Sequence, residues 1–291
     1  MKRFYDGHPA VVLSYLLGAV VFTLVFPHPL FLGVSVAAAV VTGAVVGGRR
    51  FLRFLMSVML PVALLTALLN PVFSHAGVTV LDYLPDGNPF TAESVIYGGC
   101  AGLTLVAAGS FLYVLGTVFS SDKAVYLAGR LSPSAALTFA MTLRFLPRYA
   151  ERFQAVKRAA GEEEAHGFPA KVKGAVSRFS AVTAYALESA PQTAKVMRAR
   201  GYGTTKRTAF AVYRFTRDEG IISAFLVLSA AGLTAAALTG VAAYRVYPSV
   251  KSAPFGTAFF AALAGYAAYC FLPVICGIGE VIRWKRSLSK G

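Results

Sequence analysis

The chain has 291 residues, 56% of them hydrophobic, and a mean hydropathy of +0.62. Soluble domains contain roughly 45–50% apolar residues, so this composition excludes an ordinary soluble domain and indicates a membrane protein with several spans. The formal net charge of +15 does not indicate nucleic acid, because the Lys and Arg residues lie between apolar runs or at their ends. That placement is typical of a cytoplasmic lipid surface or an acidic protein partner.

The apolar runs predict an all-α integral membrane protein with about six transmembrane helices, since a hydrocarbon core of about 30 Å needs about 20 helical residues. The expected spans are 9–26, 30–46, 51–69, 92–119, 220–243 and 255–282. Lys2 and Arg3 precede the first run, and the further spans favour a retained first helix over a cleaved signal peptide. Residues 72–91 are expected to form an exposed hairpin-like loop that turns at Asp86-Gly87.

Proline and glycine residues mark features inside these spans. Pro61 predicts a kink in the third span, and Asn70-Pro71 predicts its end. The pairs Gly98-x-x-x-Gly102 and Gly43-x-x-x-Gly47 predict close contacts between helices.

A charged segment separates the two groups of spans and divides the chain into residues 1–120, 121–218 and 219–291. It holds seventeen of the twenty-eight basic residues and is too charged to lie in lipid. We expect three helical pieces there, 122–130, 133–160 and 171–200, which form a cytoplasmic domain of long amphipathic helices.

The third piece carries one apolar stripe at helical spacing, formed by Val172, Val176, Phe179, Thr183, Ala186 and Ala190. This face is expected to lie on something apolar, either the membrane surface or a crossing helix. Pro191 then either kinks this helix or starts a separate short one.

The distribution of Lys and Arg predicts the orientation in the membrane. The basic segments are the N-terminus, the Arg49-Arg50-Arg53 turn, the central segment and residues 283–286. Six spans place all of them on one face, which the positive-inside rule makes cytoplasmic. The exceptions are Arg245 and Lys251, which fall on the opposite face.

The third piece ends in Arg198-Ala199-Arg200-Gly201-Tyr202-Gly203. Gly201 can adopt the left-handed conformation that stops a helix, so Arg200 is expected on a short, stiff tip. A cation at this end also suits the helix dipole. The simpler interpretation is an ordinary basic helix end beside anionic lipid.

Motifs for catalysis or cofactor binding are missing from the sequence. No Gly-x-x-x-x-Gly-Lys-Ser/Thr run is present, so we expect no nucleotide hydrolysis by this chain. The four histidines and three cysteines lack the spacing of metal ligands. The sequence therefore predicts neither a metal nor another cofactor.

In four short motifs the chain resembles the transmembrane T component of energy-coupling factor (ECF) transporters, the family of the cobalt-transporter Q-type proteins. The motifs are Asn70-Pro71, Asn88-Pro89-x-Thr91-x-Glu93-x-x-x-Tyr97-Gly98, Arg144-Phe145-x-Pro147, and Arg198-Ala199-Arg200-Gly201-Tyr202-Gly203 followed by Arg207-Thr208. The resemblance implies a non-catalytic scaffold in a bacterial or archaeal cell membrane, with both termini cytoplasmic. Its implied partners are two cytosolic ABC ATPases and a membrane-embedded S component that captures a vitamin or metal ion.

The resemblance also implies the docking residues. Two crossing helices of the family each end in an Ala-Arg-Gly motif that docks on one ATPase. The motif carries over unchanged to Ala199, Arg200 and Gly201, with Arg144, Pro147 and Arg198 as supporting residues.

The other tip, here called the first tip, is the end of the expected helical piece 133–160. The aligned residues there are Ala159, Ala160 and Gly161, with Ala160 in place of the arginine. Either Arg158 or Lys157 substitutes for it, or this tip binds by shape and other charges.

Two other functions compete with the scaffold. A conventional ABC importer permease would line its own substrate path and carry polar residues inside its spans. An intramembrane enzyme would need paired catalytic residues at membrane depth. The spans are nearly free of charged residues, which favours the scaffold.

Overall fold

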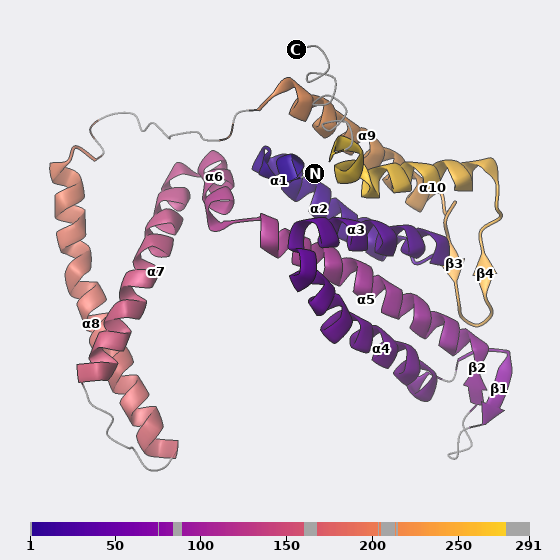
Figure 1. The fold of residues 1–291 in the computed structure, drawn as a ribbon, viewed down its shortest axis with the longest axis horizontal. Helices are drawn as coiled ribbons and strands as arrows, with labels where there is room; N and C mark the ends of the chain where they lie inside the picture. Colours follow the sequence, from indigo (N-terminus) through magenta and orange to yellow (C-terminus); the bar gives the residue numbers. More distant parts are fainter. Residues whose placement is uncertain are drawn as a thin grey trace. The chain divides into compact units, whose positions relative to one another are not determined.

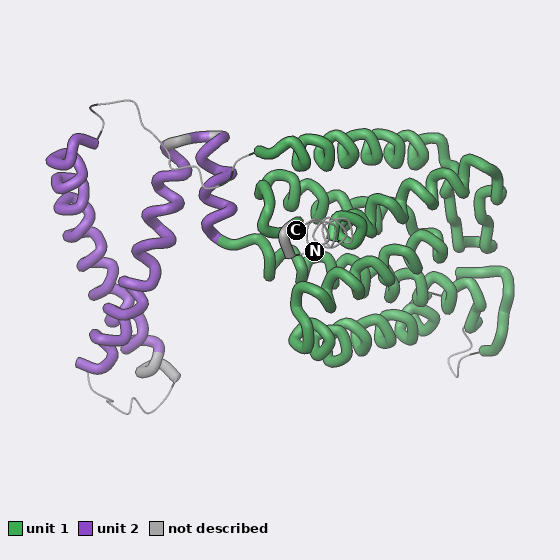
Figure 2. The backbone as a smooth tube through the Cα atoms, turned by 45° about the horizontal axis from the view of Figure 1, so that its top comes forward, with its two compact units in different colours: residues 1–120, 213–291 green, residues 121–212 purple. Residues whose placement is uncertain are grey.

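The computed structural model describes residues 2–74, 76–83, 89–159, 168–202, 204, 213 and 215–277 and is mostly helical. The chain forms two compact units (Figure 2). Unit 1 contains residues 1–120 and 213–291, and unit 2 contains residues 121–212. The N-terminal and C-terminal groups of apolar helices thus belong to one unit, and the charged segment is an insertion between them.

Unit 1 is built from apolar helices and two small antiparallel hairpins (Figure 1). Its elements are α1 (Lys2–Asp6), α2 (Pro9–Val25), α3 (Pro29–Phe54), the π-helical turn η1 (Leu55–Met59), α4 (Leu60–Phe73), β1 (Val80–Tyr83), β2 (Pro89–Thr91), α5 (Ala92–Val118), α9 (Arg217–Leu238), β3 (Tyr244–Arg245), β4 (Lys251–Ser252) and α10 (Thr257–Cys270). Strand β1 pairs with β2, and β3 pairs with β4.

Three helical stretches in the described part of the chain are long and apolar enough to cross a membrane. They are Pro29–Phe73, Ala92–Val118 and Arg217–Leu238, and the apolar helices α2 and α10 are shorter. Unit 1 also exposes large apolar side chains, including Leu64, Leu68 and Leu228. Such a surface is unfavourable in water, and it is consistent with a membrane protein.

The first of these stretches contains the turn expected between the second and third spans. Gly48 has φ 53° and ψ −133°, a conformation that L-residues with a side chain rarely adopt. On either side of this region α3 and α4 run in opposite directions (Figure 1). The arginines of the basic turn, Arg49, Arg50 and Arg53, are exposed there.

The two prolines of the third expected span, Pro61 and Pro71, agree with the sequence prediction only in part. The π-helical turn η1 lies directly before Pro61, so the irregularity predicted there is a change of helical pitch. The predicted end at Asn70-Pro71 is wrong, because α4 continues through Pro71 to Phe73. Pro71 lacks the N–H that would bond to the carbonyl of Ala67 in a regular helix. That carbonyl instead faces Gly98 of α5.

Glycines let α5 approach α4 closely, as the spacing predicted. A Cβ atom at Gly98 would lie 2.9 Å from the carbonyl oxygen of Ala67, and one at Gly102 would lie 2.8 Å from that of Ala63. The second glycine pair, Gly43 and Gly47, lies against the side chain of Phe51 in the same helix, and Gly47 also lies close to Tyr113 of α5. Helix α5 packs against α2, α3 and α4 and is central to unit 1.

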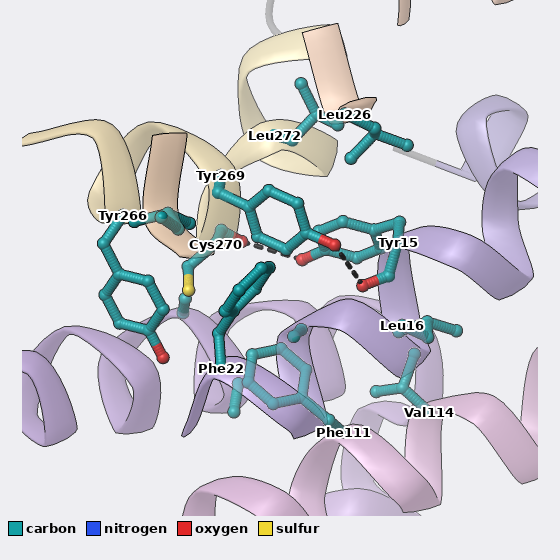
Figure 3. Packing of buried hydrophobic residues seen from close by; sticks show 14 of the residues in the cluster. Tyr15, Leu16, Phe22, Phe111, Val114, Leu226, Tyr266, Tyr269, Cys270 and Leu272 are labelled. Atoms are coloured by element: carbon teal, nitrogen blue, oxygen red, sulfur yellow. Dashed lines mark hydrogen bonds between the residues drawn. The ribbon is translucent and has the colours of Figure 1, made fainter. Parts of the chain in front are cut away.

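A cluster of buried tyrosines joins α10 to α2 and α3 (Figure 3). The hydroxyl of Tyr15 donates to the carbonyl of Cys270 at 2.7 Å, and that of Tyr269 donates to the carbonyl of Tyr15 at 3.1 Å. The hydroxyl groups of Tyr266 and Ser35 lie 2.6 Å apart, which connects α10 to α3. These phenols satisfy their polar groups inside an apolar core, as buried tyrosines require.

The N-terminus of α9 also contacts the N-terminus of α2. Thr216 and Glu219 form a capping box, in which each side chain accepts from the other's backbone N–H. The same carboxylate accepts the backbone N–H of His8 at 2.6 Å. Thr216 and Glu219 therefore belong to unit 1, and unit 2 ends at residue 212 rather than at the expected 218.

We predict that Gly102→Ala destabilises unit 1 by about 1–3 kcal/mol, the usual cost of overpacking. The added methyl group meets backbone atoms of α4 that have little freedom to move. Gly99→Ala is the matched control, because a Cβ atom there has no neighbour within 4 Å. Unfolding of the purified protein in detergent measures both changes, and equal stability of the two variants would contradict the close approach of α5 to α4.

Candidate functional site

Unit 2 consists of α6 (Ser121–Leu131), α7 (Pro133–Ala159) and α8 (Phe168–Ala199). These bounds confirm the three predicted helical pieces. Helices α7 and α8 run in opposite directions and cross (Figures 1 and 2). Each helix is continuous across its internal proline, Pro147 in α7 and Pro191 in α8, so Pro191 does not start a separate helix.

Two arginines of α7 hold one tyrosine of α8 where the helices meet. The guanidinium groups of Arg148 and Arg152 donate to the hydroxyl of Tyr185 at 3.0 and 3.5 Å. The central carbon of the Arg152 guanidinium also lies 4.7 Å from the centre of the Tyr185 ring. Stacking and hydrogen bonding together restrain how the two helices cross.

The electrostatics of this contact are visible in the pKa of Tyr185. Burial by itself raises this pKa, but the hydrogen bonds and positive charges of Arg152 and Arg148 lower it, and the net pKa is below that of an ordinary tyrosine. The sequence interpretation missed Tyr185. The available signal was the i, i+4 spacing of Arg148 and Arg152, which places both on one face of α7.

The end of α8 is a Schellman motif, formed as the Arg-Gly sequence predicted. Gly201 has φ 81° and donates its N–H to the carbonyl of Arg198 at 2.9 Å. Tyr202 donates its N–H to the carbonyl of Met197 at 3.1 Å. This pair of hydrogen bonds satisfies two terminal carbonyls and ends the helix sharply.

The Schellman motif holds the backbone of Arg200 in a fixed position. Its N–H still bonds to the carbonyl of Val196 at 3.1 Å, while its side chain is exposed. Beyond the stop, the hydroxyl of Thr204 donates to the carbonyl of Gly201 at 2.7 Å and tightens the turn. A guanidinium here is favoured by the negative end of the helix dipole and is available to a partner's carboxylate.

A groove of about 720 Å³ lies between α7 and α8 and includes Arg200. Its charged lining residues are Arg144, Arg148, Glu188 and Arg200, and its apolar lining includes Met141, Phe145, Val196 and Met197. The structure thus brings the predicted residues Arg144 and Arg200 to one surface. Three arginines against one glutamate make that surface cationic.

The other predicted docking residues lie elsewhere in unit 2. Arg198 and Pro147 are exposed but do not line the groove. At the first tip, Ala159 ends α7, and Arg158 donates its Nε–H to the carbonyl of Gln154 in its own helix at 3.4 Å. Ala160 and Gly161 lie outside the described residues.

The apolar stripe of α8 is largely uncovered in its first half. Val176 is 61% and Phe179 is 68% exposed, and Leu187 further along is 71% exposed. Helix α7 therefore covers only part of α8. A partner or a lipid surface is needed to remove the remaining apolar side chains from water.

Candidate metal ligands are not grouped in the part of the chain that the structure describes. No cluster of three or more His, Cys, Asp or Glu residues is found among those residues. The buried Glu93 has a structural role, since it accepts the hydroxyl and the backbone N–H of Thr79 and so secures the β1–β2 hairpin to the start of α5.

No protein family model matches the chain, and no curated protein matches its sequence.

We predict that Tyr185→Phe loosens the crossing of α7 and α8, because Phe keeps the ring but removes the hydroxyl that both arginines share. Spin labels at Thr138 and Lys195 should give a broader distance distribution in this variant. Tyr126→Phe is the control, since Tyr126 stacks with Arg130 inside α6. An unchanged distribution in Tyr185→Phe would show that the hydroxyl does not restrain the helices.

Proposed function

We propose that this chain is the membrane scaffold of an ECF-type importer, which transmits the motion of two cytosolic ATPases to a separate substrate-binding S component. The family resemblance suggests this role. The observation that carries it is the end of α8, where a Schellman stop presents Arg200 on a stiff, exposed tip. The chain itself hydrolyses no nucleotide in this proposal.

In this proposal unit 1 crosses the membrane six times. The six spans use α2, α3, η1 with α4, α5, α9 and α10. The arrangement of unit 1 supports this topology. The Gly48 turn, the end of α5 and the starts of α2 and α9 lie at one end of the unit, and both β-hairpins lie at the other (Figure 1). The exposed arginines of the Gly48 turn make the first end cytoplasmic by the positive-inside rule.

Docking uses the charge and stiffness of α8. With 32 residues, this helix is about 48 Å long at 1.5 Å per residue, so force applied at its tip reaches the crossing point with little loss. Arg200 makes a bidentate contact with a carboxylate on one ATPase. The first tip, near Ala159, docks on the second ATPase with weaker charge complementarity.

The exposed apolar stripe of α8 supports the other half of the proposal. Val176 and Phe179 offer a surface that suits an apolar membrane partner such as the S component. When the ATPases move the two tips, the crossed helices turn together at Tyr185 and shift this surface. Rigid-body motion of packed helices is a common way to transmit such a change.

We predict that Arg200→Glu leaves the protein inserted but sharply reduces co-purification with its ATPases. Loss of one partner of a buried charge pair costs about 2–5 kcal/mol, which corresponds to at least roughly 30-fold weaker binding. Lys173→Glu is the matched control, because it makes the same charge change at an exposed position near the other end of α8. Normal ATPase binding and transport by Arg200→Glu would remove the docking role.

We also predict that Ala160→Arg is tolerated or tightens ATPase binding at the first tip, because it restores the arginine of the implied motif. Ala155→Arg, at an exposed position of α7 five residues earlier, controls for a general effect of added charge. Binding measured on the assembled complex separates the outcomes. Failure of Ala160→Arg to assemble would show that this tip requires a small residue for close packing.

A further inference from the structure

A cavity of about 590 Å³ lies within unit 1 at the end that carries the hairpins. One wall is a face of α5 with helical spacing, formed by Tyr97, Cys100, Ala101, Thr104 and Leu105. The opposite wall is residues 244–247, which include strand β3, and Pro27 completes the lining. The wall on α5 covers eight residue steps, or about 12 Å along the helix, so the cavity is elongated along the helix axis and largely apolar.

One cation lines this cavity at the hairpin, and a second is its partner on the neighbouring strand. Arg245 lines the cavity, and Lys251 is the partner of Arg245 across the β3–β4 ladder. Directly opposed residues of a two-stranded ribbon place their side chains on the same face, and like charges there are destabilising. Both side chains are exposed, and neither makes an ion pair with any residue that the structure describes.

Tyrosine contacts hold the hairpin in place against α5. The hydroxyl of Tyr247 lies 3.2 Å from that of Ser74 and 3.4 Å from that of Ser94. The rings of Tyr247 and Tyr97 lie 5.3 Å apart. The two cations are therefore attached to a fixed wall of the cavity, and the cavity is formed before any ligand arrives.

We propose that this cavity binds one anionic phospholipid of the non-cytoplasmic leaflet. Its phosphate pairs with Arg245 and Lys251, and one acyl chain lies along α5 between Tyr97 and Leu105. Tyr97, Tyr244 and Tyr247 then lie at the depth of the headgroups, where amphipathic aromatic rings are favoured. The bound phosphate relieves the repulsion between the two cations and explains why they occur on the face that otherwise lacks Lys and Arg.

The chemistry of the cavity favours a lipid over a soluble anion. A soluble phosphate would use the two cations but leave the apolar wall of α5 in contact with water, whereas a phospholipid uses both. The inference rests on the membrane topology given under the proposed function, which puts the hairpin end of unit 1 on the non-cytoplasmic side. It does not depend on ATPase docking, so the two proposals can fail separately.

The test is fluorescence quenching by brominated lipids in nanodiscs that contain the full chain without partners. Leu105→Trp places a reporter in the cavity, in a background with Trp284→Phe to remove the natural tryptophan. Leu64→Trp on an exposed face of α4 is the matched reporter for ordinary lipid contact. Quenching by brominated phosphatidylglycerol is compared with quenching by brominated phosphatidylcholine.

We expect the site at the cavity reporter to prefer phosphatidylglycerol over phosphatidylcholine roughly fivefold or more, as measured by quenching, because each basic residue near the surface adds about 1 kcal/mol of attraction. The reporter on α4 should show no preference between the two lipids. The combined change Arg245→Gln and Lys251→Gln should abolish the preference, and Arg245→Lys should retain it. Equal quenching of the cavity reporter by both lipids would overturn the proposal. A preference that survives the double change would overturn it as well.

Discussion

The contact between the Tyr269 hydroxyl and Gly18 is the constraint on which unit 1 depends. A Cβ atom at position 18 would collide with this hydroxyl, which instead donates to the carbonyl of Tyr15. The contact joins residues about 250 positions apart in the sequence. Together with the hydrogen bonds of Tyr15, Tyr266 and Glu219, it joins the C-terminal helices to α2 and α3, so the two groups of apolar helices form one body and the charged segment is an insertion.

Two kinds of interaction hold the apolar helices together. Small residues allow close backbone approach, as at Gly98 and Gly102, and buried hydroxyls find partners on neighbouring helices, as at Tyr15 and Tyr266. Helices in lipid gain little from the hydrophobic effect, so packing and hydrogen bonds carry their association. The large exposed leucines of unit 1 suit contact with a membrane.

Different interactions hold unit 2 together, because its helices are long, charged and only partly covered by one another. Its internal order comes from the contact of Arg148 and Arg152 with Tyr185 and from the Schellman stop at Gly201. The first fixes how the helices cross, and the second fixes where α8 ends. The proposed coupling role needs both, because a helix tip can transmit force only when its own backbone and the crossing point are rigid. The exposed apolar face of α8 leaves a surface that a partner or a lipid surface can cover.

The sequence by itself determined the local features of this protein. Hydrophobic runs and charge placement predicted the apolar helices and the three helical pieces of unit 2. Gly201 predicted the stop of α8, and Gly98 and Gly102 predicted a close helix contact. These properties follow from helical periodicity, backbone freedom at glycine and side-chain size, which act over a few residues.

Only the tertiary structure decided which segments meet. The pairing of Tyr185 with two arginines, the joining of α2 to α10, and the cavity beside Arg245 and Lys251 each bring together residues from different helices or hairpins. It also decided that Pro71 lies inside α4 and Pro191 inside α8. A proline removes one hydrogen bond, and whether a helix continues past it depends on the packing around the freed carbonyl. That packing is set by neighbours distant in the chain, which local patterns do not specify.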